Sequence, residues 1–175
     1  HSYKKPEIDK GDKFSPEVSV SAEQIQKLFR DPGFMDKDEA EVVKTNSAHS
    51  GRSGSNVLDG KPSTIWHTSW GGGKIPHPHE IHLKIDYSAK IKGLTILPRQ
   101  DGNTNGYIKK CSVYAKQSGS WGKPVWQGSF KRNMEKKLVS FDKPVKAKYF
   151  RIVSEEGFAG DDYTSIAEIK LLPAE

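Results

Sequence analysis

The chain has 175 residues, a formal net charge of +6 and a pI near 9.2, with 34% apolar and 29% charged residues. This length suits one domain with an appendage and is sufficient for a buried core. A membrane-spanning helix is not expected, because no run of about 18 apolar residues is present. The single cysteine, Cys111, excludes an internal disulfide, and its alternating apolar neighbours indicate a buried structural thiol.

The basic residues are scattered, with short runs such as Lys109-Lys110 and Lys136-Lys137. Charges spread in this way usually form a solvated surface, so nucleic acid is not an expected partner. A sulfated or otherwise acidic glycan stays open as a ligand. We expect a monomer.

Residues 1–35 are expected to form an N-terminal linker with a short helix. His1 to Pro16 is charged and contains proline and glycine, as is typical of a linker. Ser21-Ala22-Glu23-Gln24 matches a capping box, and apolar residues follow it at helical spacing. This pattern predicts a helix over about 21–30.

Residues 36–175 have the pattern of an all-β domain. Ile81, Leu83 and Ile85 alternate with polar residues, which predicts a half-buried strand. Similar patterns occur at 94–96, 111–115, 138–141, 149–153 and 169–171. Several short strands with no helix between them favour an antiparallel sandwich or barrel.

The stretch from Asn56 to Trp70, NVLDGKPSTIWHTSW, concentrates polar and aromatic side chains. Asp59-Gly60 is a turn signal, and the chain returns to strand-like residues at Trp66. A carboxylate, the Thr64 hydroxyl and free carbonyl groups are ligands that Ca²⁺ prefers, although the EF-hand pattern is absent. From these residues alone, a surface turn before a core tryptophan is the simpler interpretation.

This stretch is followed by PHEIHLKI, GLTILPRQDGNTNGYIKKCSVYAK and YFRIVSEEGFAGDDYTSIAEIKLL. The combination resembles a discoidin domain, also called the coagulation factor type C domain, and more narrowly the bacterial family 32 carbohydrate-binding modules. The resemblance runs in order from about Glu39 to Leu172. It implies an eight-stranded antiparallel jelly-roll β-sandwich that is secreted, cell-surface or periplasmic. The missing disulfide favours the bacterial branch over the animal one.

The resemblance also implies a structural Ca²⁺ site between the Asp59 loop and the last strand. The implied side-chain ligands are the carboxylates of Asp59 and Glu168 and the hydroxyl of Thr64. Backbone carbonyls complete the set, from Asn56, Lys61, Thr64 and Ala167. A cation there would close a long chain loop and stabilise the fold. The family often has an acidic or amide residue where Lys61 stands.

A second implied site binds terminal galactose or N-acetylgalactosamine. Galactose-binding members of the family use a histidine, an arginine, an asparagine and an aromatic ring. The matching residues here are His67, Arg99, Asn105, Phe158 and Tyr163, with Trp70 as a further platform. The Arg99 loop has one residue more than expected, so Asn103 is an alternative to Asn105. The choice between the Phe158 and Tyr163 rings stays open.

Each of these residues also has a simpler structural interpretation. His67 next to a tryptophan is often a hydrogen-bonded structural residue. Arg99 could pair with Asp101 or with an acidic residue of the 155–162 loop, and Phe158 could cover the barrel end. The sugar site therefore requires that three loops converge at one end of the sandwich.

No enzymatic site is expected in this chain. His77-Pro78-His79 with His82 lacks the spacing of a zinc site. Two carboxylates set across a cleft, as in glycosidases, are not evident, and no G-x-S-x-G motif is present. We therefore expect a non-catalytic module that targets a larger enzyme to glycans. The alternative is an adhesion domain that binds a protein, an anionic lipid or a sulfated glycan surface through Trp70 and Phe158.

Overall fold

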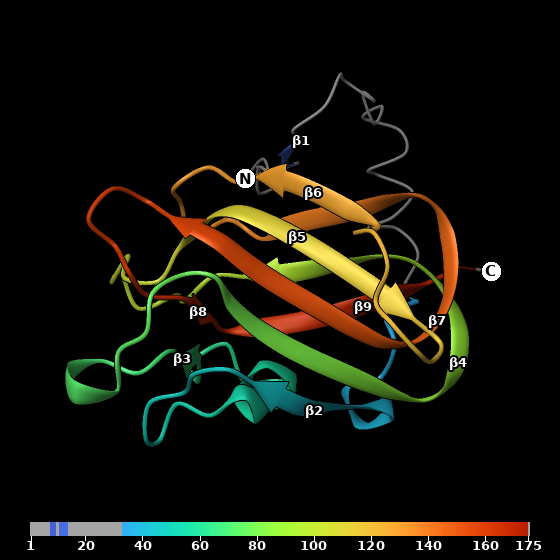
Figure 1. Cartoon of the computed structure of the whole chain (residues 1–175), viewed down its shortest axis with the longest axis horizontal. Helices are drawn as coiled ribbons and strands as arrows, with labels where there is room; N and C mark the ends of the chain where they lie inside the picture. Colours follow the sequence, from blue (N-terminus) through green and yellow to red (C-terminus); the bar gives the residue numbers. More distant parts are fainter. Residues whose placement is uncertain (1–7, 10, 14–32, 175) are drawn as a thin grey trace, which may run out of the picture.

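The computed structural model describes residues 8–9, 11–13 and 33–174, which form nine named strands and three short 3₁₀ turns (Figure 1). The strands are β1 (Asp12–Lys13), β2 (Ala40–Thr45), β3 (Trp66–His67), β4 (His79–Leu97), β5 (Ile108–Lys116), β6 (Trp126–Ser129), β7 (Lys137–Gly157), β8 (Ser165–Ile166) and β9 (Glu168–Pro173). The 3₁₀ turns are η1 (Lys37–Glu39), η2 (Gly54–Leu58) and η3 (Gly71–Gly73).

The long strands β4 and β7 each take part in two layers of the fold. Residues 81–85 of β4 pair with β2, and residues 79–84 pair with residues 149–154 of β7. Pairing continues from β7 through β5, β6 and β1. Residues 91–97 of β4 pair with β9 and with the first half of β7. Figure 1 shows both long strands bending at the right-hand end. The predicted antiparallel β-sandwich is therefore confirmed, and two-residue strands account for the larger strand count.

The core lies between these layers and follows the predicted alternation. Ile81, Leu83 and Ile85 are buried on β4. Trp66 and Cys111 are also fully buried, as the sequence predicted for both. Burial raises the pKa of the Cys111 thiol, which keeps it protonated and unreactive.

The described residues of the predicted N-terminal linker contact the sheet. β1 pairs antiparallel with β6, and Lys137 Nζ donates to Asp9 Oδ2 at 2.9 Å in a buried ion pair. The predicted helix at 21–30 lies outside the described residues. In the described part of the chain, no helix is long and apolar enough to cross a membrane.

Candidate functional site

Two loops far apart in sequence meet where β3 pairs with β8, at the left-hand end in Figure 1. His67 lies opposite Ser165 in this small antiparallel ladder. Beyond it, Thr68 N donates to the Thr164 carbonyl at 2.9 Å, and Thr164 N donates to Thr68 Oγ1 at 3.0 Å. The 66–70 segment is therefore fixed against the loop before β9.

A third loop, which follows β4 and contains Arg99, is attached to the same strand. Ser165 N donates to the Gly106 carbonyl at 2.9 Å, and Ser165 Oγ donates to the Asn105 carbonyl at 2.8 Å. Gly106 N in turn donates to Asp161 Oδ2 at 2.7 Å. Gly106 has a φ of +91°, and a Cβ there would lie 2.5 Å from Ser165 N, so only glycine allows this approach.

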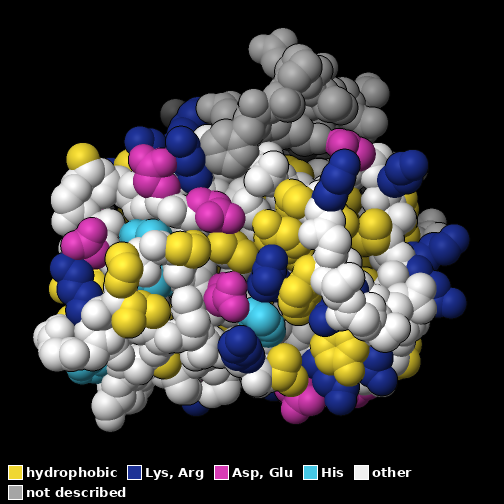
Figure 2. Space-filling view, viewed as in Figure 1, with side chains coloured by type: hydrophobic (Ala, Val, Ile, Leu, Met, Phe, Trp, Pro, Cys, Tyr) yellow, Lys and Arg dark blue, Asp and Glu magenta, His cyan; other side chains and the backbone are white. Residues whose placement is uncertain are grey.

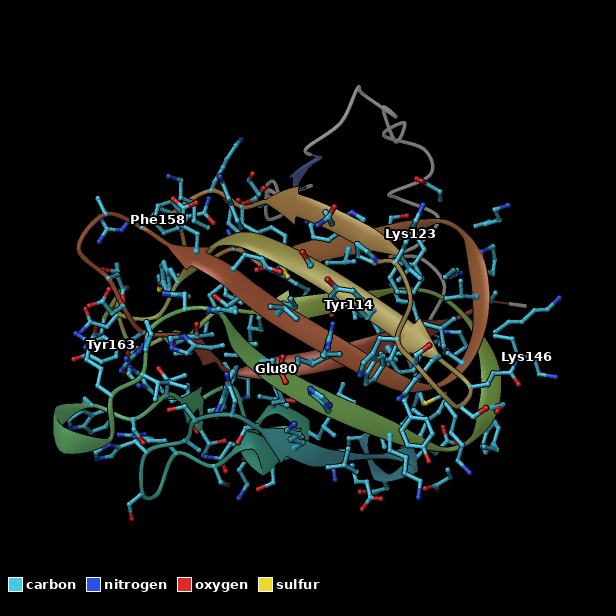
Figure 3. All side chains as sticks on the ribbon, viewed as in Figure 1. Glu80, Tyr114, Lys123, Lys146, Phe158 and Tyr163 are labelled. Carbon is cyan, nitrogen blue, oxygen red and sulfur yellow. The ribbon has the colours of Figure 1, made fainter. Side chains whose placement is uncertain are left out.

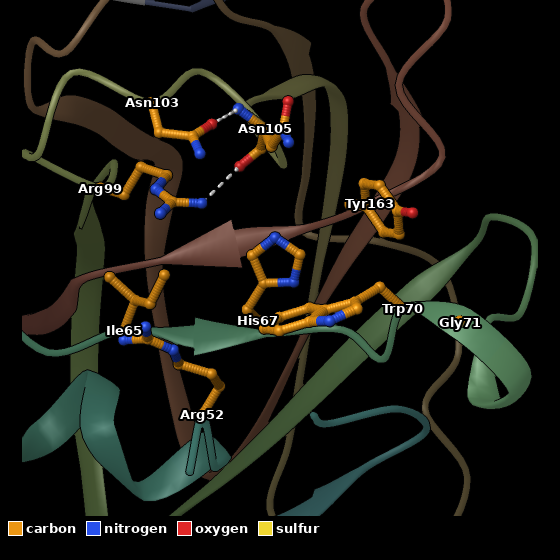
Figure 4. A pocket seen from close by; sticks show the side chains of 9 residues that line it. All are labelled: Arg52, Ile65, His67, Trp70, Gly71, Arg99, Asn103, Asn105 and Tyr163. Carbon is orange, nitrogen blue, oxygen red and sulfur yellow. Dashed lines mark hydrogen bonds between the residues drawn. The ribbon is translucent and has the colours of Figure 1, made fainter. Parts of the chain in front are cut away.

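The three loops surround a pocket of about 380 Å³ (Figure 4). Of the residues that the sequence analysis proposed for the sugar site, six line it: His67, Trp70, Arg99, Asn103, Asn105 and Tyr163. The convergence that the sugar site required is thus present. Three further lining residues, Arg52, Ile65 and Gly71, were not predicted. Arg52 and Gly71 lie outside the motifs, and Ile65 lies within the Asn56–Trp70 stretch but has an apolar side chain that gives no sign of a binding role.

His67 presents a hydrogen-bond acceptor in this pocket. Its Nδ1 lies 2.6 Å from the Thr68 carbonyl oxygen, and because a carbonyl only accepts, Nδ1 carries the proton. Nε2 is then the unprotonated nitrogen. Burial lowers the pKa of His67 below its ordinary value of 6.5, so the ring is neutral at pH 7. The expected structural hydrogen bond therefore exists and also fixes the tautomer.

Arg99 is held by an ion pair at the opposite wall of the pocket. Its Nε and Nη2 donate to the two carboxylate oxygens of Asp101, at 3.0 and 2.7 Å. These bonds hold the pKa of Asp101 below its usual range. Arg99 Nη1 points to the Asn105 carbonyl at 3.4 Å (Figure 4). Asn103 Oδ1 accepts from the backbone N of Asn105 at 2.8 Å, which orders the side-chain amide of Asn103 beside the guanidinium.

Two aromatic rings complete the pocket. Trp70 has 42% of its surface exposed and stacks on His49, with ring centroids 3.3 Å apart. The Trp70 and His67 rings are nearly perpendicular, with centroids 5.0 Å apart. His49 lies outside every motif, so sequence reasoning did not detect it. Tyr163 lies 5.4 Å from His67, and Asp161 Oδ1 accepts from its backbone N at 2.9 Å.

Phe158, the alternative aromatic platform, does not line this pocket. Its ring lies 5.8 Å from the guanidinium carbon of Arg132. Figure 3 shows Phe158 and Tyr163 at the same end of the molecule, on the segment that follows β7. The geometry therefore assigns the ring in the pocket to Tyr163.

The histidines at 77, 79 and 82 have structural partners. His79 Nε2 donates to the Ile75 carbonyl at 2.9 Å, so its Nδ1 accepts from Thr164 Oγ1 at 2.8 Å. His82 Nε2 lies 2.9 Å from Glu80 Oε1. Among the described residues, no group of three or more His, Cys, Asp or Glu side chains could hold a metal ion.

The implied calcium residues lie together where the Asp59 loop meets β9. Asp59 Oδ2 accepts from Thr64 Oγ1, and Asp59 Oδ1 accepts from Lys61 N at 2.8 Å. Thr64 Oγ1 also lies 3.1 Å from the Lys61 carbonyl. The Asn56 carbonyl lies in the same turn, where it accepts from Asp59 N at 3.4 Å. The Lys61 side chain is exposed.

Glu168 brings a second carboxyl group to the same place. Burial, together with the Asp59 carboxyl beside it, raises the pKa of Glu168 to about 7. Its Oε1 is buried and has no hydrogen-bond partner within the described residues. Two adjacent carboxyls with an unpartnered oxygen, a hydroxyl and nearby carbonyls fit an oxygen-coordinated cation such as Ca²⁺.

Charge is mixed over the surface outside these sites. Figure 2 shows Lys and Arg side chains interspersed with Asp and Glu on the face in view. Lys74–Asp162 at 2.7 Å and Lys109–Glu156 at 3.2 Å are examples of surface ion pairs. On this face, the net charge of +6 does not form a continuous basic surface.

Comparison with known proteins places this arrangement in a family. The F5/8 type C domain model matches residues 41–169. The chain is 39% identical over 138 residues to a galactose oxidase of Gibberella zeae, covering 76% of this chain and 20% of that protein. It is 30% identical over 145 residues to a sialidase of Micromonospora viridifaciens, covering 79% and 22%. The chain thus spans about a fifth of the length of these relatives.

Two solved structures are similar across nearly their whole length. The family 32 carbohydrate-binding module of NanJ from C. perfringens, in complex with galactose, has a TM-score of 0.72 and 28% identity, covering 79% of this chain and 97% of that one. The CBM32-5 module from Clostridium perfringens, in complex with GalNAc-β-1,3-galactose, has a TM-score of 0.71 and 26% identity, covering 79% and 99%.

These matches confirm the expectation of a non-catalytic module of the discoidin type, since carbohydrate-binding modules are binding domains of larger proteins. The predicted resemblance over residues 39–172 agrees with the matched range of 41–169. The chain belongs to the F5/8 type C domain family.

Proposed function

We propose that the chain is a carbohydrate-binding module that recognises terminal galactose or N-acetylgalactosamine in the pocket around His67. The observation that carries this proposal is the gathering of an acceptor, a cationic donor, two amides and two aromatic rings around one pocket of about 380 Å³. A pocket of this size, with a few convergent polar groups, suits a small ligand. The sugars bound by the two similar modules support the same ligand class.

Each lining residue has a chemical role in this proposal. His67 Nε2 accepts a hydrogen bond from a sugar hydroxyl, and the Arg99 guanidinium donates to sugar oxygens. The amide of Asn105, with Asn103 beside it, can both donate and accept. Trp70 and Tyr163 pack against the apolar face of the sugar ring. The opposed donor and acceptor fix the orientation of the hydroxyls, which gives selectivity among sugars.

A structural Ca²⁺ ion is the second part of the proposal. Asp59 and Glu168 would supply carboxylate oxygens and Thr64 its hydroxyl. The carbonyls of Asn56, Lys61, Thr64 and Ala167 would complete the shell. The cation would neutralise the paired carboxyls and hold the Asp59 loop to β9. Because the same loop continues into His67, the ion would also stabilise one wall of the pocket.

We expect the module to be part of a larger bacterial enzyme that is secreted, attached to the cell surface or periplasmic. The module would hold this enzyme near glycans. The limited coverage of the curated relatives supports this arrangement, because the matched segment is one part of each longer protein. The expected monomeric state and the absence of nucleic-acid partners stay predictions.

A glycan array of the purified chain, repeated at high salt, tests the proposal. Binding to terminal galactose or N-acetylgalactosamine that survives high salt supports it, since neutral sugars are bound without ion pairs. Trp70 is also exposed enough to contact a lipid or protein surface, which is the adhesion alternative. Signals confined to sulfated glycans or anionic vesicles, and lost in salt, would favour that alternative instead.

A further inference from the structure

A groove of about 410 Å³ lies on the outer face of the sheet that contains β2, β4, β7 and β5. It shares no lining residue with the pocket around His67. We propose that this groove is a second binding site, which takes a sugar unit that carries a carboxylate or a sulfate group. The inference goes beyond the proposed function and does not depend on it. The lining includes Lys44, His82, Lys116, Ser118, Trp121 and Tyr149.

Strand alternation places a row of cationic and aromatic side chains on this face. Leu83 and Phe150 are fully buried in the core, so the adjacent residues His82 and Arg151 point to the opposite side of the sheet. Lys44 on β2 lies opposite His82, and His82 lies opposite Arg151. The row therefore crosses three strands, β2, β4 and β7.

The loop after β5 adds an indole ring to this row. The Trp121 ring is nearly perpendicular to the His82 ring, with centroids 5.4 Å apart. Lys116 Nζ lies 4.2 Å from the centre of the Trp121 ring and 5.8 Å from that of Tyr149. It also donates to the Gly119 carbonyl at 2.6 Å. These contacts hold the loop against the sheet, so the groove is formed before a ligand binds.

The positive charge in and beside the groove has no carboxylate partner. Among the residues that the structure describes, no Asp or Glu forms an ion pair with Lys44, Lys116 or Arg151. The guanidinium carbon of Arg151 lies 4.0 Å from the centre of the Tyr114 ring and 5.3 Å from that of Trp121. An anionic group in the groove would therefore meet cations that the described carboxylates leave uncompensated.

A sugar unit suits this groove better than an extended polyanion. Figure 2 shows acidic and basic side chains interspersed on this face, so a nucleic acid or an anionic membrane would also meet carboxylates. Glu80 is one of them (Figure 3), and its Oε1 lies 2.9 Å from His82 Nε2. Trp121 and Tyr149 offer ring surface for the apolar face of a sugar, and Ser118 is exposed and offers a hydroxyl. The two lysines would bind the acidic substituent.

¹⁵N–¹H spectra of the whole chain at low salt test this site, with the Trp121 indole N–H as the reporter. The probes share one ring: methyl β-galacturonide carries a carboxylate, the sulfate ester of methyl β-galactoside carries a sulfate, and methyl β-galactoside is neutral. We expect the Trp121 signal to shift with at least one acidic probe and not with the neutral one. The acidic probe that binds more tightly identifies the substituent. High salt should weaken this binding, since ion pairs contribute to it.

Lys44→Gln should lower the affinity for the acidic probe roughly tenfold, because a charge-assisted hydrogen bond is lost. Lys146→Gln is the matched control, since it removes the same charge from an exposed residue of β7 that does not line the groove. It should leave the affinity nearly unchanged. His67→Phe, which alters the other pocket, should retain the Trp121 shift. This variant separates the groove from the loops around His67, which are the alternative place for an acidic glycan.

The absence of a Trp121 shift with either acidic probe would overturn the inference, as would equal losses of affinity in Lys44→Gln and Lys146→Gln. An equal shift with methyl β-galactoside would show that the groove does not select acidic sugars. A response confined to anionic vesicles or DNA would assign the surface to another class of ligand. The Trp70 signal with methyl β-galactoside reports on the proposed function separately, so either hypothesis can fail while the other stands.

Discussion

Arg99 donates two hydrogen bonds to Asp101, from Nε at 3.0 Å and from Nη2 at 2.7 Å, and still lines the pocket around His67. The guanidinium is therefore compensated and oriented before any ligand arrives. Arg99 can therefore be both a structural ion-pair partner and a sugar ligand, because the ion pair with Asp101 fixes the orientation of its guanidinium in the pocket. Preorganisation of this kind lowers the entropic cost of binding.

Arg99→Lys should weaken galactose binding at least roughly tenfold, because an ammonium cannot form the planar fork that Arg99 makes with Asp101. Its effect on stability should be small, about 1 kcal/mol, since Asp101 remains largely solvated. Titration calorimetry measures the first effect and urea unfolding the second. Lys146→Gln, an exposed charge change on β7, serves as the control. Unaltered affinity in Arg99→Lys would remove Arg99 from the site.

Galactose binding should depend on pH through His67. Burial lowers the pKa of His67 below 6.5, and Nε2 accepts only while it is unprotonated. Affinity should thus be constant between pH 7 and 8 and fall on acidification once the pH drops below the lowered pKa. His67→Phe should lose binding at every pH. Sugar titrations at a series of pH values, from pH 8 down into the acidic range, check the profile. An affinity that rises in acid contradicts the assigned tautomer.

Calcium should stabilise the wild-type chain and not Asp59→Ala. A ligand at a hundred times its Kd contributes about 2.7 kcal/mol to folding. Thermal unfolding of both proteins, in calcium and in a chelator, measures the difference. The Asp36→Ala variant, which changes an exposed carboxylate at η1, is the control and should respond to calcium like the wild type. Equal melting temperatures with and without calcium in the wild-type chain would contradict the metal site.

The metal-free chain should lose stability as the pH rises through Glu168. The folded pKa of Glu168 is raised to about 7 from an ordinary 4.5, so protonation favours the folded state. This contribution is fully present below pH 4.5 and is lost as the pH rises to about 7. Calcium should therefore stabilise the chain more at pH 8 than at pH 6, since it replaces the proton. Glu168→Gln should flatten the metal-free profile, as urea unfolding at several pH values would show.

Gly106→Ala should destabilise the fold and weaken sugar binding together. The added Cβ would lie 2.5 Å from Ser165 N, and φ is +91°. We expect a loss of about 2–4 kcal/mol, because the strain of positive φ adds to a backbone clash. Gly102→Ala is the matched control, since its φ of +83° brings strain but no atom within 4 Å. Equal losses in the two variants would show that the contact with Ser165 is unimportant.

The fold and most of the pocket could be predicted from sequence because they depend on local patterns. The alternation at Ile81, Leu83 and Ile85 follows from strand geometry, and the polar residues of the pocket other than Arg52 belong to motifs. His49 and Arg52 could not be found in this way. They enter the site through tertiary contacts with the 67–70 segment, which no spacing in the sequence records: the Arg52 carbonyl accepts from His67 N, and the His49 ring accepts from Trp70 N and stacks on the Trp70 ring.

Two further differences have a physical cause in tertiary contacts. Asp9 lies in a segment of linker composition, yet its buried ion pair with Lys137 joins it to the sheet. The choice between Phe158 and Tyr163 depended on the direction of one turn. The Asp161 carboxylate fixes that turn, because it accepts from Tyr163 N and from Gly106 N, and sequence alone does not give that geometry.

The central claim is that galactose binds between His67, Arg99 and the Trp70 ring. ¹⁵N–¹H spectra of the chain during titration with methyl β-galactoside test it most directly, because the indole N–H groups report on separate regions. Trp70 lines the pocket, whereas Trp121 lies among Lys116, Arg151 and His82 on the outer face of the sheet. We predict that the Trp70 indole signal shifts with sugar and the Trp121 signal does not. A shift at Trp121 with Trp70 unchanged, or no shift at either ring, would contradict the account.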